Sequence, residues 1–130
     1  MKEIVLFFGA FYGMLSVIFG AFGAHALKKK FTAEQLTSFE TGVKYQMYHA
    51  ILLIILGLAL PMVNSIEHFT AIFFIIGIFL FSFSIYALCI SSSSGKKLKI
   101  LGPVTPLGGL CLVIGWVLLI VIFTSYGFYL

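Results

Sequence analysis

The sequence predicts an all-α integral membrane protein: an antiparallel, up-and-down four-helix bundle that forms a single transmembrane domain over residues 1–130. Hydrophobic residues make up 62% of the chain, charged residues 9%, and the mean hydropathy is +1.17, so too little polar surface exists to cover a water-soluble globule. Four apolar runs each approach the ~20 residues that a helix needs to cross the hydrocarbon. None shows the period-two alternation of a lipid-embedded barrel. We expect spans at approximately residues 4–26, 45–63, 69–90 and 105–128.

The first span carries a row of small residues at alternating spacings of four and three, here called the glycine seam. Its members are Gly9, Gly13, Ser16, Gly20 and Gly23. Small residues on one helix face let another backbone approach closely. We expect the seam to pack against the fourth span, where Gly108 and Gly115 offer a matching surface; a homodimer contact through the seam is the alternative.

The second span follows the most polar part of the chain, residues 27–46. Thr32 and Gln35 have the spacing of a capping box, so a helix is predicted from Ala33. Its apolar and polar residues fall on opposite sides, which predicts an amphipathic cytoplasmic segment that lies partly in the membrane surface and turns inward near Tyr45. Pro61 ends the second span.

The third span is rich in phenylalanine and has Gly77 as its single glycine, so we expect it to carry much of the lipid-facing surface. The fourth is predicted to begin at Thr105 as N-cap, with Pro106 at the first helical position. The two cysteines lie inside apolar runs without metal-ligand spacing, which indicates buried reduced thiols.

The lysines predict the orientation. Seven of them precede the second and fourth spans, and Lys2 alone lies on the other side. By the positive-inside rule the lysine-rich loops are cytoplasmic and both termini are outside. The formal net charge of +4 does not indicate nucleic-acid binding, because the lysines flank hydrophobic spans and the chain has no arginine. The expected partners are membrane lipids, with another membrane protein or a second copy as alternatives.

The candidate site is a set of polar residues near the cytoplasmic ends of the first two spans: His25, Tyr45, Gln46 and His49. Ionisable groups at membrane depth usually face a bundle interior, a cavity or a partner, so these residues are predicted to form a ligand or lipid-headgroup cluster, with His25 and His49 at similar depth. The alternative is that histidine and tyrosine are here ordinary interfacial residues. Facing histidines would also suit haem or a metal, but no metal or cofactor is predicted.

No complete catalytic constellation is present, so we expect no enzymatic activity. Glu34 and Glu40 are six residues apart and do not share a helix face as a carboxylate pair would. No serine or cysteine has a base beside it, and no phosphate-binding loop of the GxxxxGK type occurs.

Three blocks resemble the domain-of-unknown-function 423 family of small bacterial membrane proteins: GAFGAHALK at 20–28, TGVKYQMYHA at 41–50, and LGPVTPLGG at 101–109 with Gly115-Trp116 beyond it. One departure is Phe83, in Ser82-Phe83-Ser84-Ile85-Tyr86, where the family usually has glycine. The resemblance covers essentially the whole chain. It implies a four-helix, multi-pass protein of the bacterial cytoplasmic (inner) membrane, and it implies no activity.

The function expected from the sequence is contact with lipid headgroups or with a membrane partner, without catalysis. A small oligomeric transporter or pore is the alternative, and it requires a polar pathway through the membrane. The spans offer few residues for one: Tyr12, Ser16, Ser82, Ser84 and Tyr86. A protein with a histidine-ligated cofactor is the third hypothesis.

Overall fold

The computed structural model describes residues 1–96 and 98–126 and confirms the all-α membrane bundle. Four stretches are long and apolar enough to cross a bilayer: Lys2–Gly23, Ala33–Ala59, Ser65–Ser93 and Lys99–Ser125. The secondary-structure elements in chain order are α1 (Lys2–Ala26), α2 (Ala33–Ala59), α3 (Ser65–Ile78), the π-helical turn η1 (Phe79–Phe83), α4 (Ser84–Ser93), the 3₁₀ turn η2 (Lys99–Leu101) and α5 (Val104–Tyr126). The expected end of the fourth span at residue 128 lies outside the described residues.

The second span is one uninterrupted helix of 27 residues. Thr32 and Gln35 form the predicted capping box, each side chain bonded to the other's backbone N–H, at 3.2 and 3.0 Å. The prediction of a surface segment that turns inward near Tyr45 is wrong. The helix continues without a break because the cap starts it at Ala33 and its apolar side, with Phe39 and Gly42 buried, already packs in the bundle. At 1.5 Å per residue it is about 40 Å long, which exceeds the roughly 30 Å of hydrocarbon in a bilayer.

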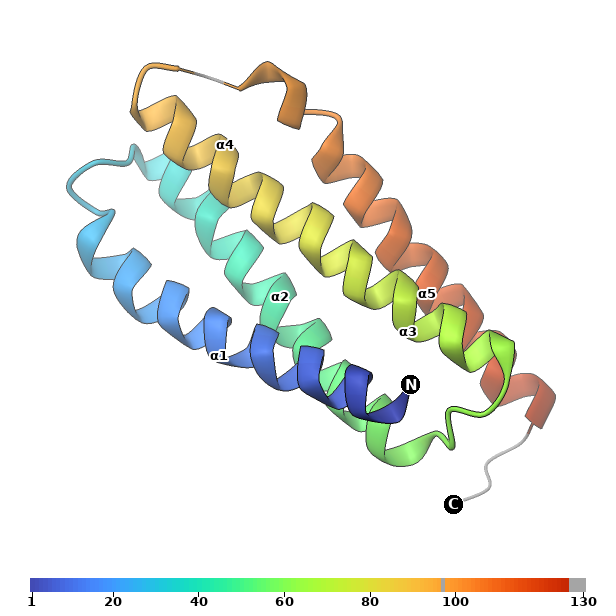
Figure 1. Ribbon diagram of the computed structural model, residues 1–130. Helices are drawn as coiled ribbons and strands as arrows, with labels where there is room; N and C mark the ends of the chain where they lie inside the picture. The colour runs from blue at the N-terminus through green and yellow to red at the C-terminus, as the bar shows by residue number, and fades with distance from the viewer. Residues whose placement is uncertain (97, 127–130) are drawn as a thin grey trace.

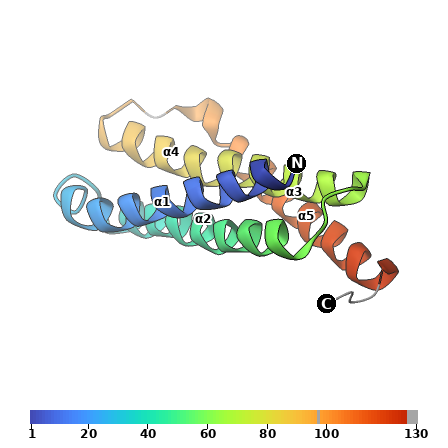
Figure 2. The same ribbon diagram turned by 60° about the horizontal axis from the view of Figure 1, so that its bottom comes forward.

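The glycine seam packs against α2 and not, as expected, against α5 (Figures 1 and 2). A Cβ added at Gly9 would lie 2.7 Å from Ile54, and one at Gly23 would meet the ring of Phe39. Among the described residues, α1 and α5 make no contact. A seam of small residues permits close approach but does not select the partner, and the short connection after Ala26 places α2 beside α1.

The glycines of α5 pack on the third span. Gly108 lies against the backbone of Leu80 and Phe81, and Gly115 lies against the ring of Phe74. The third span is more buried than the first, 39% against 22% of the most apolar stretch, in part because the Phe74 ring fills the space beside Gly115. It still exposes large apolar side chains such as Phe69 and Phe79, so the prediction that it carries much of the lipid-facing surface stays a prediction.

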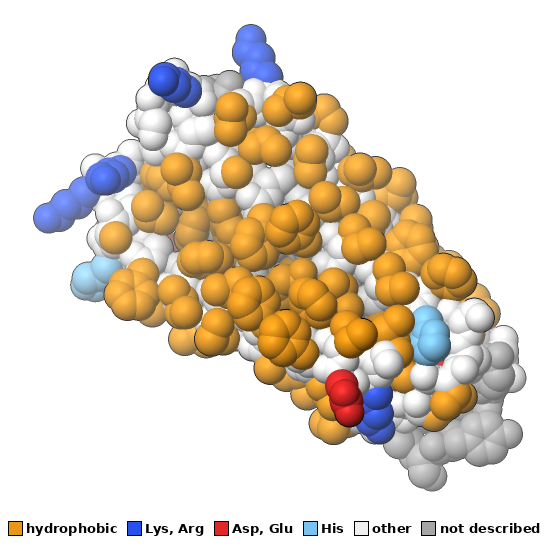
Figure 3. All heavy atoms as spheres, in the orientation of Figure 1, with side chains coloured by type: hydrophobic (Ala, Val, Ile, Leu, Met, Phe, Trp, Pro, Cys, Tyr) orange, Lys and Arg blue, Asp and Glu red, His pale blue; other side chains and the backbone are white. Residues whose placement is uncertain are grey.

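Helix α5 begins at Val104, so Thr105 lies inside its first turn and is not the N-cap. The Thr105 hydroxyl pairs instead with Ser84, with 2.6 Å between the oxygens, next to the π-helical turn. Toward this end of the bundle α5 diverges from α4, and residues 94–103 connect the two helices (Figure 1). Lysine side chains gather at the same end, and hydrophobic side chains cover the middle of the visible face (Figure 3).

Candidate functional site

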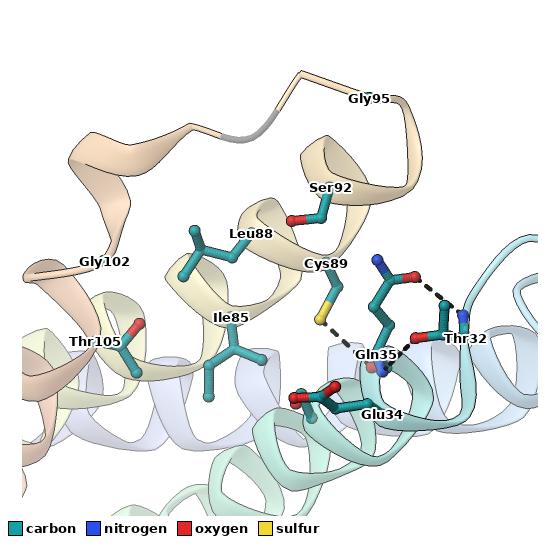
Figure 4. A pocket seen from close by; sticks show the side chains of 11 residues that line it. Thr32, Glu34, Gln35, Ile85, Leu88, Cys89, Ser92, Gly95, Gly102 and Thr105 are labelled. Carbon is teal, nitrogen blue, oxygen red and sulfur yellow. Dashed lines mark hydrogen bonds between the residues drawn. The ribbon is translucent and has the colours of Figure 1, made fainter.

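A groove of about 710 Å³ lies at the lysine-rich end, between α2, α4 and the start of α5; we call it the lysine-end groove (Figure 4). The described residues of the connection, 95–96 and 98–102, pass over it, and Gly95 and Gly102 both line it. The groove forms because α5 is held against the third span by Gly108 and Thr105 but diverges from α4 beyond them.

The walls of the lysine-end groove differ in polarity. Helix α4 contributes mainly apolar side chains, Ile85, Leu88 and Cys89. Polar groups come from Thr32, the N-cap of α2, and from the first two turns of the helix, with Glu34, Gln35 and Ser38. Ser92 and Thr105 add further hydroxyls. The Cys89 thiol is buried and donates to the Gln35 carbonyl at 3.4 Å, which ties the two walls together. A cavity with one polar and one apolar wall suits an amphiphile.

The segment over the groove alternates cations with exposed apolar side chains. Lys96 and Lys99 are exposed, and Leu98 and Ile100 are 49% and 81% exposed. Lys97 lies outside the described residues. Aliphatic side chains next to lysines are typical of a segment that sits in the membrane interface, with the chains in the acyl boundary and the ammonium groups among headgroups.

His49, from the predicted cluster, is buried where α2 faces α5. Its Nε2 lies 3.2 Å from the Trp116 indole nitrogen, which can only donate, so Nε2 accepts. Its Nδ1 therefore carries the proton and donates to the Tyr45 carbonyl at 2.7 Å. Both ring nitrogens are thus engaged, and neither is open to a metal or haem iron in this arrangement.

The structure does not bring the predicted cluster together as one site. His25 is exposed at the end of α1, where Gly23 faces Phe39, so it lies near the start of α2. His49 is ten residues beyond Phe39, about 15 Å along the helix. Tyr45 is 43% exposed and stacks on His49, with 6.2 Å between ring centroids. These residues lie outside the lysine-end groove.

Gln46 belongs to a buried hydrogen-bonded chain that the sequence interpretation missed. Its amide donates to the Tyr12 carbonyl at 2.9 Å and accepts from the Tyr86 hydroxyl at 2.8 Å. The Tyr12 hydroxyl donates in turn to the Ile75 carbonyl. Ser82, in the π-helical turn, donates to the Gly42 carbonyl at 2.8 Å. The available signal was spacing, since Gln46 follows Phe39 by two helical turns and so shares its buried face.

Four of the five residues considered for a polar pathway join helices. Tyr12, Ser82 and Tyr86 make the hydrogen bonds just described. The Ser84 hydroxyl donates to the Phe81 carbonyl of its own span at 2.9 Å and pairs with Thr105 of α5. Ser16 is also buried, and its hydroxyl has no hydrogen-bond partner among the residues that the structure describes. Such an arrangement fixes the packing of the first three spans.

Comparison with known proteins decides the family. The sequence profile of the family described as "Protein of unknown function (DUF423)" matches residues 19–109, more than half of the chain. This protein belongs to that family. The matched residues include every residue that lines the lysine-end groove. No solved structure matches the chain.

Family members of known sequence resemble the chain over nearly their full lengths. UPF0382 membrane protein YwdK of Bacillus subtilis is 35% identical over 95% of this chain and 98% of its own. UPF0382 inner membrane protein YgdD of Escherichia coli K12 is 38% identical over 92% and 88%. UPF0382 membrane protein SH2409 of Staphylococcus haemolyticus is 35% identical over 92% and 93%. The chain is accordingly a multi-pass membrane protein of a family whose function is not established.

Proposed function

We propose that this protein is a non-enzymatic membrane protein that binds a phospholipid in the lysine-end groove. The observation that carries the proposal is the composition of the groove: an apolar wall from α4, a polar wall from α2, and lysines on the segment above. A phospholipid has the same three parts. Its acyl chain suits the apolar wall, its glycerol and ester groups suit the hydroxyls, and its phosphate suits the lysines.

The size of the groove supports a headgroup as the occupant. Its 710 Å³ lies within the roughly 300–1,000 Å³ of small-molecule sites, and so holds the polar part of a lipid. The chains would continue over the exposed apolar surface of α5, where Leu107 and Leu110 are more than half exposed. Leu98 and Ile100 support the same proposal, since exposed aliphatic groups at this level would sit among lipids.

We also propose the orientation in which the lysine-rich end faces the cytoplasm and both termini face outside. Six lysines in the connections near one end and Lys44 in the first half of α2, against Lys2 at the other end, support it by the positive-inside rule. The inner leaflet is anionic, and each lysine near its surface contributes about 1 kcal/mol of attraction. Alkaline phosphatase fused to the C-terminus should be active in intact cells; an inactive fusion of full length would contradict this orientation.

The alternative functions gain less support from the same contacts. A pore needs polar groups turned toward water, whereas the Tyr12 hydroxyl donates to α3 and the Ser82 and Tyr86 hydroxyls donate to α2. A histidine-ligated cofactor needs a free imidazole nitrogen, whereas both nitrogens of His49 are bonded. Lipid binding, in contrast, requires only the side chains that line the lysine-end groove.

The proposal is tested by lysine removal. Phospholipid retained by the detergent-purified protein is counted by native mass spectrometry for wild type, for the double variant Lys96→Gln/Lys99→Gln, and for Lys2→Gln. We expect the double variant to retain about fivefold less lipid, the effect of losing roughly two weak charge contacts. Lys2→Gln should behave as wild type. Equal retention by all three proteins, or a wild type free of phospholipid, would contradict the proposal.

A further inference from the structure

We infer that the lipid headgroup bound in the lysine-end groove carries a primary ammonium group, which Glu34 accepts, so that the ligand is an ethanolamine phospholipid. The inference rests on the proposed function and specifies its ligand. It follows from the arrangement of charges around the groove, which matches a zwitterion better than an anion.

Glu34 is the one charged side chain among the described residues that line the groove. It lies in the first turn of α2, and its carboxylate points into the groove (Figure 4). Among the described residues it has no hydrogen bond or ion pair to another side chain. The dipole of α2 accounts for an acid in a first turn, but Glu34 is left with its charge unpaired beside the groove.

The positive charges lie on another element. Lys96 follows Gly95, and Lys99 precedes Gly102 by three residues, on the segment that passes over the groove. The groove therefore has a carboxylate among its lining residues on the α2 side, whereas the two lysines are exposed on the segment above and are not themselves among the lining residues. A headgroup bound between them meets opposite charges at its two ends.

Ethanolamine phospholipids match this order. Their phosphate and ammonium are joined by two carbons, so the phosphate can face the lysines while the ammonium faces Glu34. The ammonium has three N–H donors, and the hydroxyls of Ser38 and Ser92 line the same groove as further acceptors. A glycerol headgroup would put only neutral hydroxyls near the carboxylate. A choline headgroup is cationic but has no N–H to donate.

The test offers the purified, delipidated protein an equimolar mixture of ethanolamine, glycerol and choline phospholipids with identical acyl chains. Bound lipids are identified by native mass spectrometry. Wild type should retain the ethanolamine lipid about threefold over each of the others, the preference that one solvent-exposed ion pair gives. Glu34→Gln should abolish this preference. Glu40→Gln is the matched control, because Glu40 is exposed on the same helix but does not line the groove, and it should keep the preference.

The outcomes separate this inference from the proposed function. If wild type retains the glycerol lipid as well as or better than the ethanolamine lipid, the inference is overturned and lipid binding in the groove stands. A threefold preference that persists in Glu34→Gln overturns it as well. If no phospholipid is retained from any mixture, both fail. Since Glu34 is exposed, the substitution should leave the fold intact, which the helical circular dichroism signal checks.

Discussion

At the scale of single residues, the chain joins its helices through a few buried polar groups. Gln46 is fully buried and uses both ends of its amide, one toward α1 and one toward α4. Hydrocarbon contains no water that could hydrogen-bond to an unpaired polar group, so loss of one partner leaves the other unsatisfied. Interhelical hydrogen bonds in membranes contribute roughly 0.6–2 kcal/mol each.

The Tyr86 hydroxyl provides a direct measure of this contribution. Tyr86→Phe removes the donor to Gln46 without changing the ring, and it should lower the free energy of unfolding in detergent by about 1 kcal/mol. Tyr48→Phe makes the same change at a side chain that is 61% exposed and should have almost no effect. Equal stabilities of Tyr86→Phe and wild type would show that the bond adds nothing.

At the scale of helices, the contact that shapes the lysine-end groove is the one between α5 and the π-helical turn. Gly108 brings the α5 backbone against Leu80 and Phe81, and the Ser84–Thr105 pair lies nearby. A π-helical turn inserts an extra residue per turn, and such turns are frequent at functional sites. Here it places Ser82 toward α2 and Ser84 toward α5.

The adjacent glycines Gly108 and Gly109 differ in how closely the third span packs against them. A Cβ at Gly108 would overlap the Phe81 backbone nitrogen and lie 2.7 Å from the Leu80 carbonyl carbon, and neither backbone atom can move freely. Gly108→Ala should therefore cost about 1–3 kcal/mol of unfolding free energy. At Gly109 the nearest atom would be 3.7 Å away, so Gly109→Ala should be neutral or slightly stabilising. Equal destabilisation by both substitutions would contradict this packing.

Helices could be predicted from the sequence, but helix partners could not. The apolar runs and the Thr32–Gln35 cap are local signals, and they gave the elements and the start of α2. The glycine seam also identifies a packing face. The sequence does not show which helix lies beside α1. The glycines of α5 have a spacing that suits the seam equally well, although they pack against the third span. For the same reason, the hydrogen bond between Gln46 and Tyr86, which are forty residues apart, could not be predicted from the sequence.

At the scale of the whole molecule, the proposed site differs from the one expected from the sequence, and contact with lipid stays a prediction. His25 and His49 were grouped by their distance from span ends, and that grouping assumed a second span beginning near Tyr45. Since α2 begins at Ala33, His49 lies deep in the bundle and His25 near its end. The groove instead combines α2, α4 and the start of α5, three segments that no local pattern connects.

Filling the lysine-end groove with a bulky side chain tests whether a phospholipid occupies it. Ser38→Trp places an indole in the groove, and Thr37→Trp places one at an exposed neighbouring position that does not line it. Phospholipid that co-purifies with each variant is counted by native mass spectrometry. We predict that Ser38→Trp loses most of the lipid that wild type and Thr37→Trp retain. A folded Ser38→Trp protein that retains as much phospholipid as wild type would contradict lipid binding in the lysine-end groove.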